Sequence, residues 1–507
     1  MREKILYALV FSTLLLMCAP NASISYISSV ERTQQSALAS DVLYIDSDFT
    51  FTEDISTPIE VIADHVVIDG AGYKLQGPGS EMKMRGIKVF GRSKVTIKNL
   101  VVDGWERGIW VNGGEKIKIK DNIVRQCGIG IDITLNEKAQ MIGNTVSDNS
   151  LSGFYTYGCL KALYLQNIVT SNGWAGFIIA NSFKAQFIDN TVIGQGLGIG
   201  NGFYICDESA ENYFTENDVY NTGRCYWLTT STHNNTLVKN TATNAHNGFH
   251  LLWSDFNILT ENEAYDSGFY LQDSSYNYLE QNHLESTGYG NYGMYVVNGE
   301  GNNFLRNYVS NYHRAYYIRT SDYNTFSENE AVHTQASGFL VHSSHYNTLE
   351  DNIVMADDPT DPGNHIGYLL WAEWWVSDHW EIIPCTDNIL IGNEASGFNI
   401  GVNIRAADGN TLLENTIFGN RGGVYITSGS GNLIYHNNII DNNNQAMDTN
   451  PEDNYWFHPD LHEGNYWSDY TGLDDGSFGR VAGDGIGDTD IPWYFDLYPF
   501  MMMNGWL

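Results

Sequence analysis

The chain has 507 residues, of which 42% are hydrophobic, and it carries 60 acidic against 26 basic side chains, a formal net charge of −34. This composition excludes a disordered chain and a membrane-embedded one. The negative charge repels phosphate backbones and so excludes nucleic acid as a partner. Aromatic residues make up 13% of the chain, which favours strands over helices.

Residues 1–22 have the pattern of an export signal. Arg2 and Lys4 form a charged start, residues 5–17 are apolar, and residues 19–22 offer a cleavage region. The apolar run is too short for a spanning helix. Residues 23–40 are expected to be a linker. The mature protein is therefore expected to be secreted and to lie outside the cell or on its surface, or in the periplasm of an organism with two membranes.

An asparagine recurs about every 22 residues along most of the chain. The positions are Asn99, Asn122, Asn144, Asn167, Asn190, Asn217, Asn240, Asn262, Asn282, Asn307, Asn329, Asn352, Asn393, Asn415 and Asn437. A period near 22 is too long for one hairpin and suits one coil of three short strands. Stacked coils bring identical side chains into columns, where asparagines can hydrogen-bond along a ladder. We expect this column to be structural.

A glycine keeps register with the asparagine and precedes it by 14 residues, as Gly108 precedes Asn122. The first and third residues after the glycine are nearly always large and apolar, for example Ile109 and Val111. Because side chains alternate across a strand, these two residues share one face and are expected to point inward.

The repeat predicts an all-β chain, a right-handed parallel β-helix of about 15 coils with repeats of about 22 residues. The β-helix is expected over residues 41–450, including an N-terminal cap. The gap of 41 residues between Asn352 and Asn393 predicts a lateral insertion near residues 356–386. Within it, the tryptophan-rich stretch 371–380 is expected to form a flap, which is a lid, a docking surface or a segment that packs back on the solenoid. Residues 451–507 are expected to form a C-terminal cap.

Two stretches resemble NosD-like β-helix proteins of the carbohydrate-binding and sugar-hydrolysis (CASH) class. The N-terminal match covers residues 66–75 (VVIDGAGYKL), 86–89 and 95–100, and the C-terminal match covers residues 464–470 (GNYWSDY) and 483–488 (GDGIGD). With the repeats, the resemblance spans roughly residues 41–500. It implies a surface or periplasmic β-helix and, for NosD proteins themselves, copper-site maturation of nitrous-oxide reductase with a membrane transporter partner. The sequence contains no His- or Met-rich copper motif.

The residue between the two inward positions is expected to point outward, and it is often a ring. The predicted outward row contains Trp110, Tyr155, Tyr204, Trp227, His250, Tyr270, Tyr295, Tyr317 and Tyr425. Two positions further along the strand lie Asn112, Thr134, Gln272, Arg319, His342 and Arg405. Rings about 4.8 Å apart could form a platform for sugar rings, with the polar groups contacting hydroxyls or carboxylates. The alternative is that the rings only stabilise neighbouring strands.

Enzymatic activity stays open at this stage, with polysaccharide hydrolysis, elimination and epimerisation as the candidate reactions. Sugar hydrolysis generally uses two carboxyl groups, and Asp255, Asp273 and Asp322 could be considered. Asp255 and Asp322, however, lie in turn sequences, where aspartate is common because its side chain stabilises the turn conformation. Arg319 and His342, one coil apart, are the nearest match to an elimination site.

An acidic glycine-rich run near the C-terminus contains Asp484, Asp488 and Asp490. Hard cations such as Ca²⁺ take several oxygen ligands from a flexible loop, so these residues are candidate calcium ligands, although no cofactor is required. A metal-free, turn-rich cap is the alternative. Five cysteines remain after Cys18 leaves with the export signal, which permits at most two disulfides and does not select them.

Three function classes follow. The favoured one is an extracellular carbohydrate-binding β-helix with a polysaccharide or glycan as its partner. The second is a NosD-like accessory protein that docks on a membrane or surface protein through the flap or the C-terminal cap. The third is a structural cell-surface repeat protein.

Overall fold

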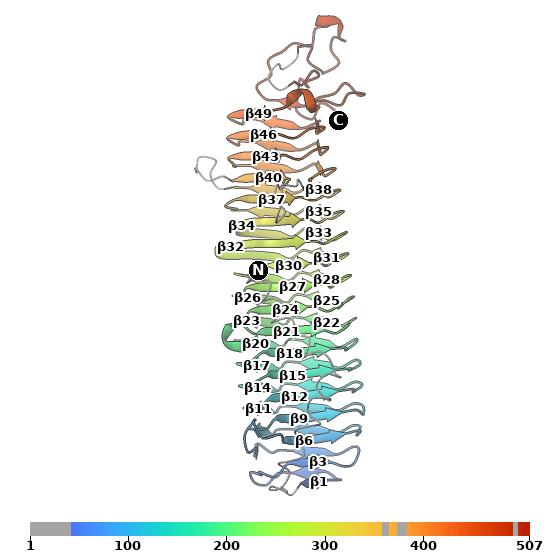
Figure 1. Ribbon diagram of the computed structural model, residues 1–507, viewed down its shortest axis with the longest axis vertical. Coiled ribbons are helices and arrows are strands. Elements are labelled where there is room, and N and C mark those ends of the chain that lie inside the picture. The colour runs from blue at the N-terminus through green and yellow to red at the C-terminus, as the bar shows by residue number, and fades with distance from the viewer. Residues whose placement is uncertain (1–41, 357–364, 373–382, 490–494) are drawn as a thin grey trace. The chain divides into compact units, whose positions relative to one another are not determined.

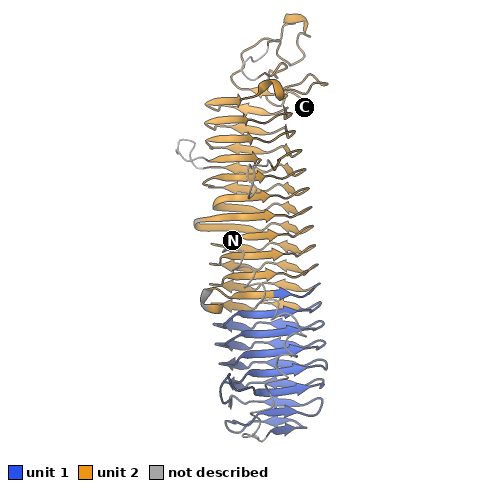
Figure 2. Cartoon of the chain, in the orientation of Figure 1, with its two compact units in different colours: residues 1–185, 205–210 blue, residues 186–204, 211–507 orange. Residues whose placement is uncertain are grey.

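A computed structural model describes residues 42–356, 365–372, 383–489 and 495–507. Two compact units are distinguished (Figure 2): unit 1 contains residues 42–185 and 205–210, and unit 2 contains residues 186–204 and 211–507. The predicted export signal and linker lie outside the described residues. Each unit is a right-handed parallel β-helix with about 23 residues per turn, as the repeat predicts.

From residue 85 onward, each coil of unit 1 contains one longer strand and two short ones. In one coil these are β9 (Arg107–Asn112), β10 (Lys118–Lys120) and β11 (Ile123–Arg125). Each pairs in parallel with its counterpart in the next coil, β12 (Ile129–Thr134), β13 (Gln140–Ile142) and β14 (Thr145–Ser147). The other longer strands of this unit include β6 (Arg85–Phe90), β15 (Ser152–Tyr157) and β18 (Ala175–Ala180).

The longer strands of unit 2 stack in the same way, and their labels rise in steps through Figure 1. They are β24 (Arg224–Leu228), β27 (Asn247–Leu252), β30 (Phe269–Gln272), β32 (His283–Val297), β34 (Tyr308–Arg319), β37 (Ser337–His342), β40 (Ile366–Trp371), β43 (Ile400–Arg405), β46 (Gly422–Thr427) and β49 (Asn444–Asp448). The helices of the described residues are three short 3-10 turns, η1 (Gln195–Gly198), η2 (Pro451–Asp453) and η3 (Ser477–Gly479).

The core is the space enclosed by each coil, and the recurring glycine lies at its wall. Ile109 and Val111 are fully buried, which confirms the predicted inward positions. A Cβ added to Gly108 would lie 2.6 Å from both the Gly130 carbonyl oxygen and Val124 Cγ1. The glycine recurs because neither the adjacent backbone nor the core leaves space for a side chain there.

The asparagine column forms a buried ladder. The Oδ1 atom of Asn307 accepts hydrogen bonds from the backbone N and Nδ2 of Asn282, at 3.0 and 2.9 Å, and the bond pattern repeats in the next coil with Asn329. The prediction is wrong by one residue at the start of the column. Leu100 takes that position and donates its N–H to Asn122, whereas Asn99 is an exposed turn residue with a φ of 53°.

A second buried asparagine ladder runs five residues before the first, and the sequence analysis did not identify it. Its members in unit 2 are Asn212, Asn235, Asn257, Asn277, Asn302, Asn324, Asn347, Asn388, Asn410, Asn432 and Asn454. The side-chain amide of each member but the last donates a hydrogen bond to the side-chain oxygen of its counterpart in the next coil. Each coil in this region therefore contains two buried asparagines whose amide groups are hydrogen-bonded. The signal was present in the sequence as a second asparagine at a fixed offset.

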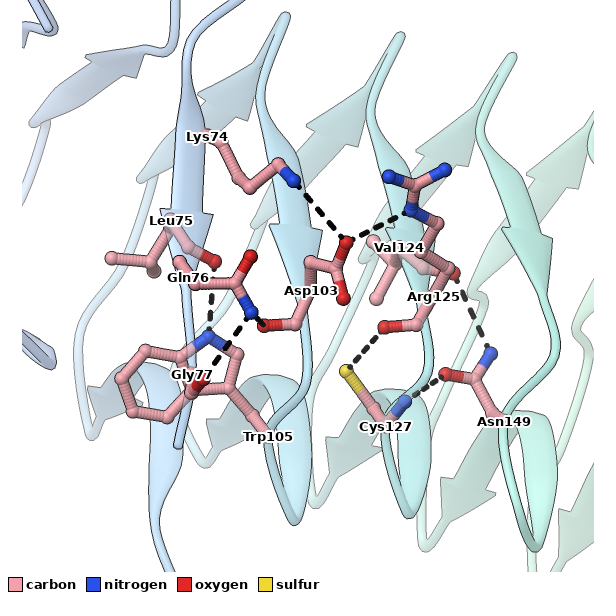
Figure 3. Close-up of polar contacts among 10 residues, drawn as sticks. All are labelled: Lys74, Leu75, Gln76, Gly77, Asp103, Trp105, Val124, Arg125, Cys127 and Asn149. Atoms are coloured by element: carbon pink, nitrogen blue, oxygen red, sulfur yellow. Dashed lines mark hydrogen bonds and ion pairs between the residues drawn. The ribbon is translucent and has the colours of Figure 1, made fainter. Parts of the chain in front are cut away.

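Polar contacts also tie consecutive coils together at the N-terminal turns of unit 1 (Figure 3). Asp103 is buried and forms ion pairs with Lys74 at 3.6 Å and Arg125 at 3.0 Å, from the coils on either side. The fully buried Trp105 donates its indole N–H to the Leu75 carbonyl at 3.1 Å. These bonds lie where the asparagine ladder has not yet begun.

The predicted insertion is divided by a strand. Strand β40 lies between Asn352 and Asn393 and pairs with β37 and β43, so the coil itself continues through this region. Trp371, predicted as the start of the flap, is the last residue of β40. Residues 357–364 and 373–382, which include the rest of the flap, lie outside the described residues. Beyond β49, the C-terminal segment contains little regular structure and buries Trp456 and Trp467.

Candidate functional site

The predicted outward row is a true column over much of unit 2. Trp227 is aligned with His250, His250 with Tyr270, Tyr270 with Tyr295, and Tyr295 with Tyr317. The strands β24, β27, β30, β32 and β34, which stack on one another in Figure 1, therefore place one ring per coil on the same face. In unit 1 the equivalent column is interrupted, because Asp132 lies between Trp110 and Tyr155.

The rings of unit 2 form a continuous chain of contacts, which we call the ring path. Its members are Tyr204, Trp227, His250, Tyr270, Tyr295, Tyr317, His342 and Trp371, with successive ring centroids 4.9, 6.0, 4.9, 4.8, 4.8, 5.9 and 4.6 Å apart. After Tyr317 the column continues with Leu340, and the path moves two residues along the strand to His342. Sequence register alone did not indicate this shift.

Most of the predicted row is buried rather than exposed, which corrects the expectation of an open platform. Trp110, Tyr204, His250, Tyr295, Tyr317 and His342 are 2 to 9% exposed. The physical reason is the coil spacing, because rings about 4.8 Å apart cover each other's faces. Tyr155, Trp227, Tyr270, Arg319 and Tyr425 are partly exposed, as are two rings that the prediction did not include, Tyr292 and Trp371.

Tyr270 breaks the parallel stacking within the ring path. Its ring is inclined by 76° to His250 and by 62° to Tyr295, whereas Tyr295 and Tyr317 are inclined by only 13°. Tyr292 packs beside Tyr295 and Tyr317 with centroids 5.1 and 5.4 Å away. Tyr270 and Tyr292 are both partly exposed, as are Trp227 and Trp371 on the same face.

Arginines flank the ring path on both sides. Arg224 and Arg314 lie three residues before the ring column on β24 and β34, and Arg319 and Arg405 lie two residues after it on β34 and β43. The Arg314 guanidinium is 5.8 Å from the Tyr292 ring and 5.7 Å from the Tyr317 ring. The Arg405 guanidinium is 5.6 Å from the Trp371 ring. These distances place the cations within reach of cation–π attraction.

His250 is neutral at this face. Burial and the nearby Arg224 lower the pKa of His250 to about 3. Arg224 Nε donates to His250 Nδ1 at 3.0 Å, so the imidazole proton lies on Nε2. His250 Nε2 and Trp227 Nε1 are buried ring nitrogens without a hydrogen-bond partner in the described part of the chain.

The predicted elimination pair is brought together, but its histidine is buried. Arg319 and His342 are register neighbours on β34 and β37. Tyr317 and Trp371 stack against the two sides of the His342 ring, and the Tyr317 hydroxyl lies 2.7 Å from His342 Nδ1. Burial raises the pKa of the Tyr317 hydroxyl above its usual range. His342 therefore forms part of the ring path rather than an accessible base.

The carboxylates considered for hydrolysis hold turns. Asp255 Oδ1 accepts the Ser275 N–H at 2.7 Å, and Asp322 Oδ1 accepts the His345 N–H at 2.7 Å. Asp273 accepts hydrogen bonds from the side chains of Gln272 and Asn298. None of these side chains forms the flanking pair that hydrolysis requires.

Unit 1 contains a polar cluster that the sequence analysis missed. Asp132 is fully buried, forms an ion pair with Arg107, and accepts a hydrogen bond from the Thr134 hydroxyl at 2.9 Å. Burial raises the pKa of Asp132 to about 6. The guanidinium of Arg85 lies 3.9 Å from the Trp110 ring. An acidic residue in an outward column of rings was the available signal.

In the described segment, the predicted calcium ligands accept hydrogen bonds from backbone N–H groups. Asp488 Oδ2 accepts the N–H groups of Asp475 and Gly476, each at 2.6 Å, and Asp484 accepts the Ile486 N–H at 3.0 Å. Asp490 lies outside the described residues. Among the residues that the structure describes, no group of three or more His, Cys, Asp or Glu side chains could hold a metal ion. Calcium binding stays a prediction.

A shallow depression of about 540 Å³ lies elsewhere on unit 2. Its lining includes Lys239, Glu261 and His283. Lys239 pairs with Glu261 at 3.5 Å, and His283 lies 3.7 Å from Glu285. Because its charges are paired internally, we favour the ring path as the functional face. No helix in the described part of the chain is long and apolar enough to cross a membrane.

Several solved structures are similar to the chain. DFA-IIIase from Arthrobacter chlorophenolicus A6, in complex with GF2, is 12% identical with a TM-score of 0.36, over 52% of this chain and 81% of that one. The periplasmic alginate epimerase AlgG is 15% identical with a TM-score of 0.35, over 75% and 79%. The A-module of the Azotobacter vinelandii mannuronan C-5 epimerase AlgE4 is 14% identical with a TM-score of 0.23, over 76% and 88%. No curated protein matches the chain.

Two protein families match the sequence itself. The right-handed β-helix region matches residues 80–219. The family described as periplasmic copper-binding protein (NosD) matches residues 197–321 and 291–472, which together span more than half of the 507 residues. The chain therefore belongs to the NosD family of β-helix proteins.

Proposed function

We propose that this protein binds carbohydrate on the face of unit 2 that carries the ring path. The observation that supports this proposal is the continuous contact of eight rings with partly exposed members along its length, Trp227, Tyr270 and Trp371. A stacked hydrophobic edge that follows the coil axis suits a linear polymer better than a small compact ligand. Tyr292 widens this surface beside Tyr295.

The chemistry of the face suits sugars. Aromatic rings with a polar edge pack against the C–H faces of pyranose rings and leave hydroxyls for hydrogen bonds. Gln272 and Arg319 lie partly exposed beside the rings on the same strands.

Copper, which the family description implies, does not fit the described residues. Copper sites are built from closely grouped nitrogen and sulfur ligands, and no such group of His, Cys, Asp or Glu is present among these residues. All five described cysteines are buried. Burial raises the pKa of Cys127, Cys159 and Cys225 to about 12, which opposes the thiolate form that binds metal. We therefore derive no chemistry through copper.

We place the protein outside the cytoplasm as part of the same proposal. The family description is periplasmic, and the N-terminal 22 residues have the pattern of an export signal. A carbohydrate polymer is a partner available in that location. Docking on a membrane or surface protein and a purely structural role stay predictions, because no contact within the described residues favours either one.

The test is a glycan-array screen of the mature protein, with and without calcium, followed by titration calorimetry on the glycans that bind. The Tyr270→Ala/Tyr292→Ala double variant removes two partly exposed rings of the face. We expect its affinity to fall at least about tenfold, equivalent to about 1.4 kcal/mol. Tyr213→Ala, which removes an exposed ring from the short strand β22 (Tyr213–Thr215), is the matched control and is expected to bind normally.

The fold of each variant is checked by circular dichroism, because the ring path also contributes to packing. Loss of binding in the double variant with an unchanged spectrum and normal binding by Tyr213→Ala supports the proposed face. An absence of binding to every glycan, with or without calcium, overturns the proposed function. Equal binding by wild type and both variants overturns the assignment of the face.

A further inference from the structure

The parts of the longer strands that carry the ring path contain arginines but no acidic residues. From β24 to β46, the longer strands contain four arginines, Arg224, Arg314, Arg319 and Arg405. Their only carboxylate is Glu285, near the start of β32. That part of β32 pairs with β29 (Glu263–Tyr265) on another side of the coil. The sequence of unit 2 as a whole contains 40 acidic and only 8 basic residues, with these four arginines among the 8. Half of the basic residues of a strongly acidic unit therefore lie on one face.

We infer that the carbohydrate bound on this face is an anionic glycan, whose carboxylate or sulfate groups are held by these arginines. This inference rests on the proposed function and specifies its ligand class. A neutral sugar needs rings and hydrogen bonds, but it does not need a cation on each side of the rings. The surrounding negative charge would repel an anionic polymer everywhere except where local positive charge outweighs it within a Debye length of about 8–10 Å.

Arg314 and Arg405 are available to a ligand. Neither forms an ion pair with any carboxylate in the part of the chain that the structure describes, and their recorded contacts are with rings. Arg405 is exposed and Arg314 is partly exposed. A guanidinium that packs on a ring keeps its N–H groups for in-plane contacts, and these match carboxylate or sulfate oxygens in pairs.

The positions of the arginines fit a linear polymer. Arg319 and Arg405 belong to one column, separated by the coils of His342 and Trp371, so they lie about 14 Å apart along the coil axis at about 4.8 Å per coil. Arg314 lies on the opposite side of the rings, five residues before Arg319 on the same strand. A polymer running along the rings would meet cations on both of its edges and at more than one residue of its length.

The four arginines outnumber the carboxylate that lies next to the ring column. Asp273 follows β30 directly, and its carboxylate accepts hydrogen bonds from Gln272 and Asn298 in the turn. His250 is neutral because its pKa is lowered by burial and by Arg224. The four arginines therefore keep this face positively charged at neutral pH.

The experiment measures binding of the full mature chain to three polymers, polygalacturonate, dextran sulfate and uncharged dextran, by affinity electrophoresis and titration calorimetry. The Arg314→Gln/Arg405→Gln variant removes two charges from the face. The matched control, Lys94→Gln/Lys161→Gln, removes two exposed charges from unit 1. Circular dichroism verifies that each variant is folded.

We expect at least one anionic polymer to bind tenfold or more tightly than dextran, and its affinity to fall about tenfold in the arginine variant, equivalent to about 1.4 kcal/mol. The lysine variant is expected to bind like wild type, and the affinity is expected to fall as salt increases. Preference for polygalacturonate or for dextran sulfate identifies the anionic group.

Other results separate failure of this inference from failure of the proposed function. Equal binding of dextran and the anionic polymers, with loss in Tyr270→Ala/Tyr292→Ala, overturns the anionic ligand and keeps the carbohydrate face. Equal loss in the lysine and arginine variants shows unspecific attraction and also overturns the inference. If none of the three polymers binds and the glycan array is negative, both proposals fail.

Discussion

Removal of one asparagine from the buried ladder should destabilise several coils. The Asn307 side chain makes four hydrogen bonds: it accepts two from Asn282, and its Nδ2 donates to the Leu279 carbonyl at 2.9 Å and to Asn329 Oδ1 at 3.0 Å. Asn307→Ala removes all four. It leaves the backbone N–H of Asn282 buried without its acceptor, in a site that is 1% exposed.

The expected cost follows from these contacts. A net hydrogen bond contributes about 1 kcal/mol, and a buried donor left unsatisfied costs about 1–3 kcal/mol. Because the Asn282 Nδ2 keeps its second bond to the Leu259 carbonyl, the losses are not independent. The total is about 3–5 kcal/mol, which is large compared with the usual effect of about 1 kcal/mol for a point substitution.

The assay is hydrogen exchange followed by mass spectrometry, because coils of a solenoid can open locally. Peptides around Asn282, Asn307 and Asn329 should exchange about 100- to 1000-fold faster in the variant, which is the equivalent of about 3–4 kcal/mol. The control is Asn291→Ala, an exposed asparagine in β32, for which a change below about 0.5 kcal/mol is expected. Equal, small effects of the two substitutions would refute the reasoning that the ladder stabilises the coils.

Three further predictions concern stability and reactivity. Burial raises the folded-state pKa of Asp132 to about 6, above its unfolded value, so the native state binds the proton more tightly than the unfolded state. The free energy of unfolding should therefore fall by about 2–3 kcal/mol between pH 4 and pH 7. Urea unfolding should show a smaller pH dependence for Asp132→Asn, and an unchanged dependence of the unfolding free energy on pH would contradict this. Buried thiols with raised pKa values should resist iodoacetamide at pH 8 until urea is added, as mass spectrometry can show for Cys127, Cys159, Cys225 and Cys385. Gly153→Ala would place a Cβ 2.7 Å from Val169 Cγ1 and 2.8 Å from the Gly176 oxygen. It should therefore lower the free energy of unfolding by about 1–3 kcal/mol and lower the thermal midpoint. The control is Gly419→Ala, where a Cβ meets open space, so that only the positive φ of this residue should affect stability.

The period of the repeat was enough to predict the architecture and the alignment of the coils. A repeat of fixed period decides which residues lie above one another, because each parallel strand pairs with its copy in the next coil. The inward positions of Ile109 and Val111 and the alignment of Tyr270 with Tyr295 follow from that period alone. The family resemblance was likewise readable from short stretches near the two ends of the chain.

The exposure of the aligned side chains, and the contacts between them, became known only from the folded coils. The period says nothing about the ring planes, so the covering of Tyr295 by Tyr317, the inclined ring of Tyr270 and the shift of the ring path to His342 were not predictable from spacing. The flanking position of Arg314 depends on side-chain directions in β34. These features are set by rotamers and by packing between neighbouring coils, which a one-dimensional repeat does not encode.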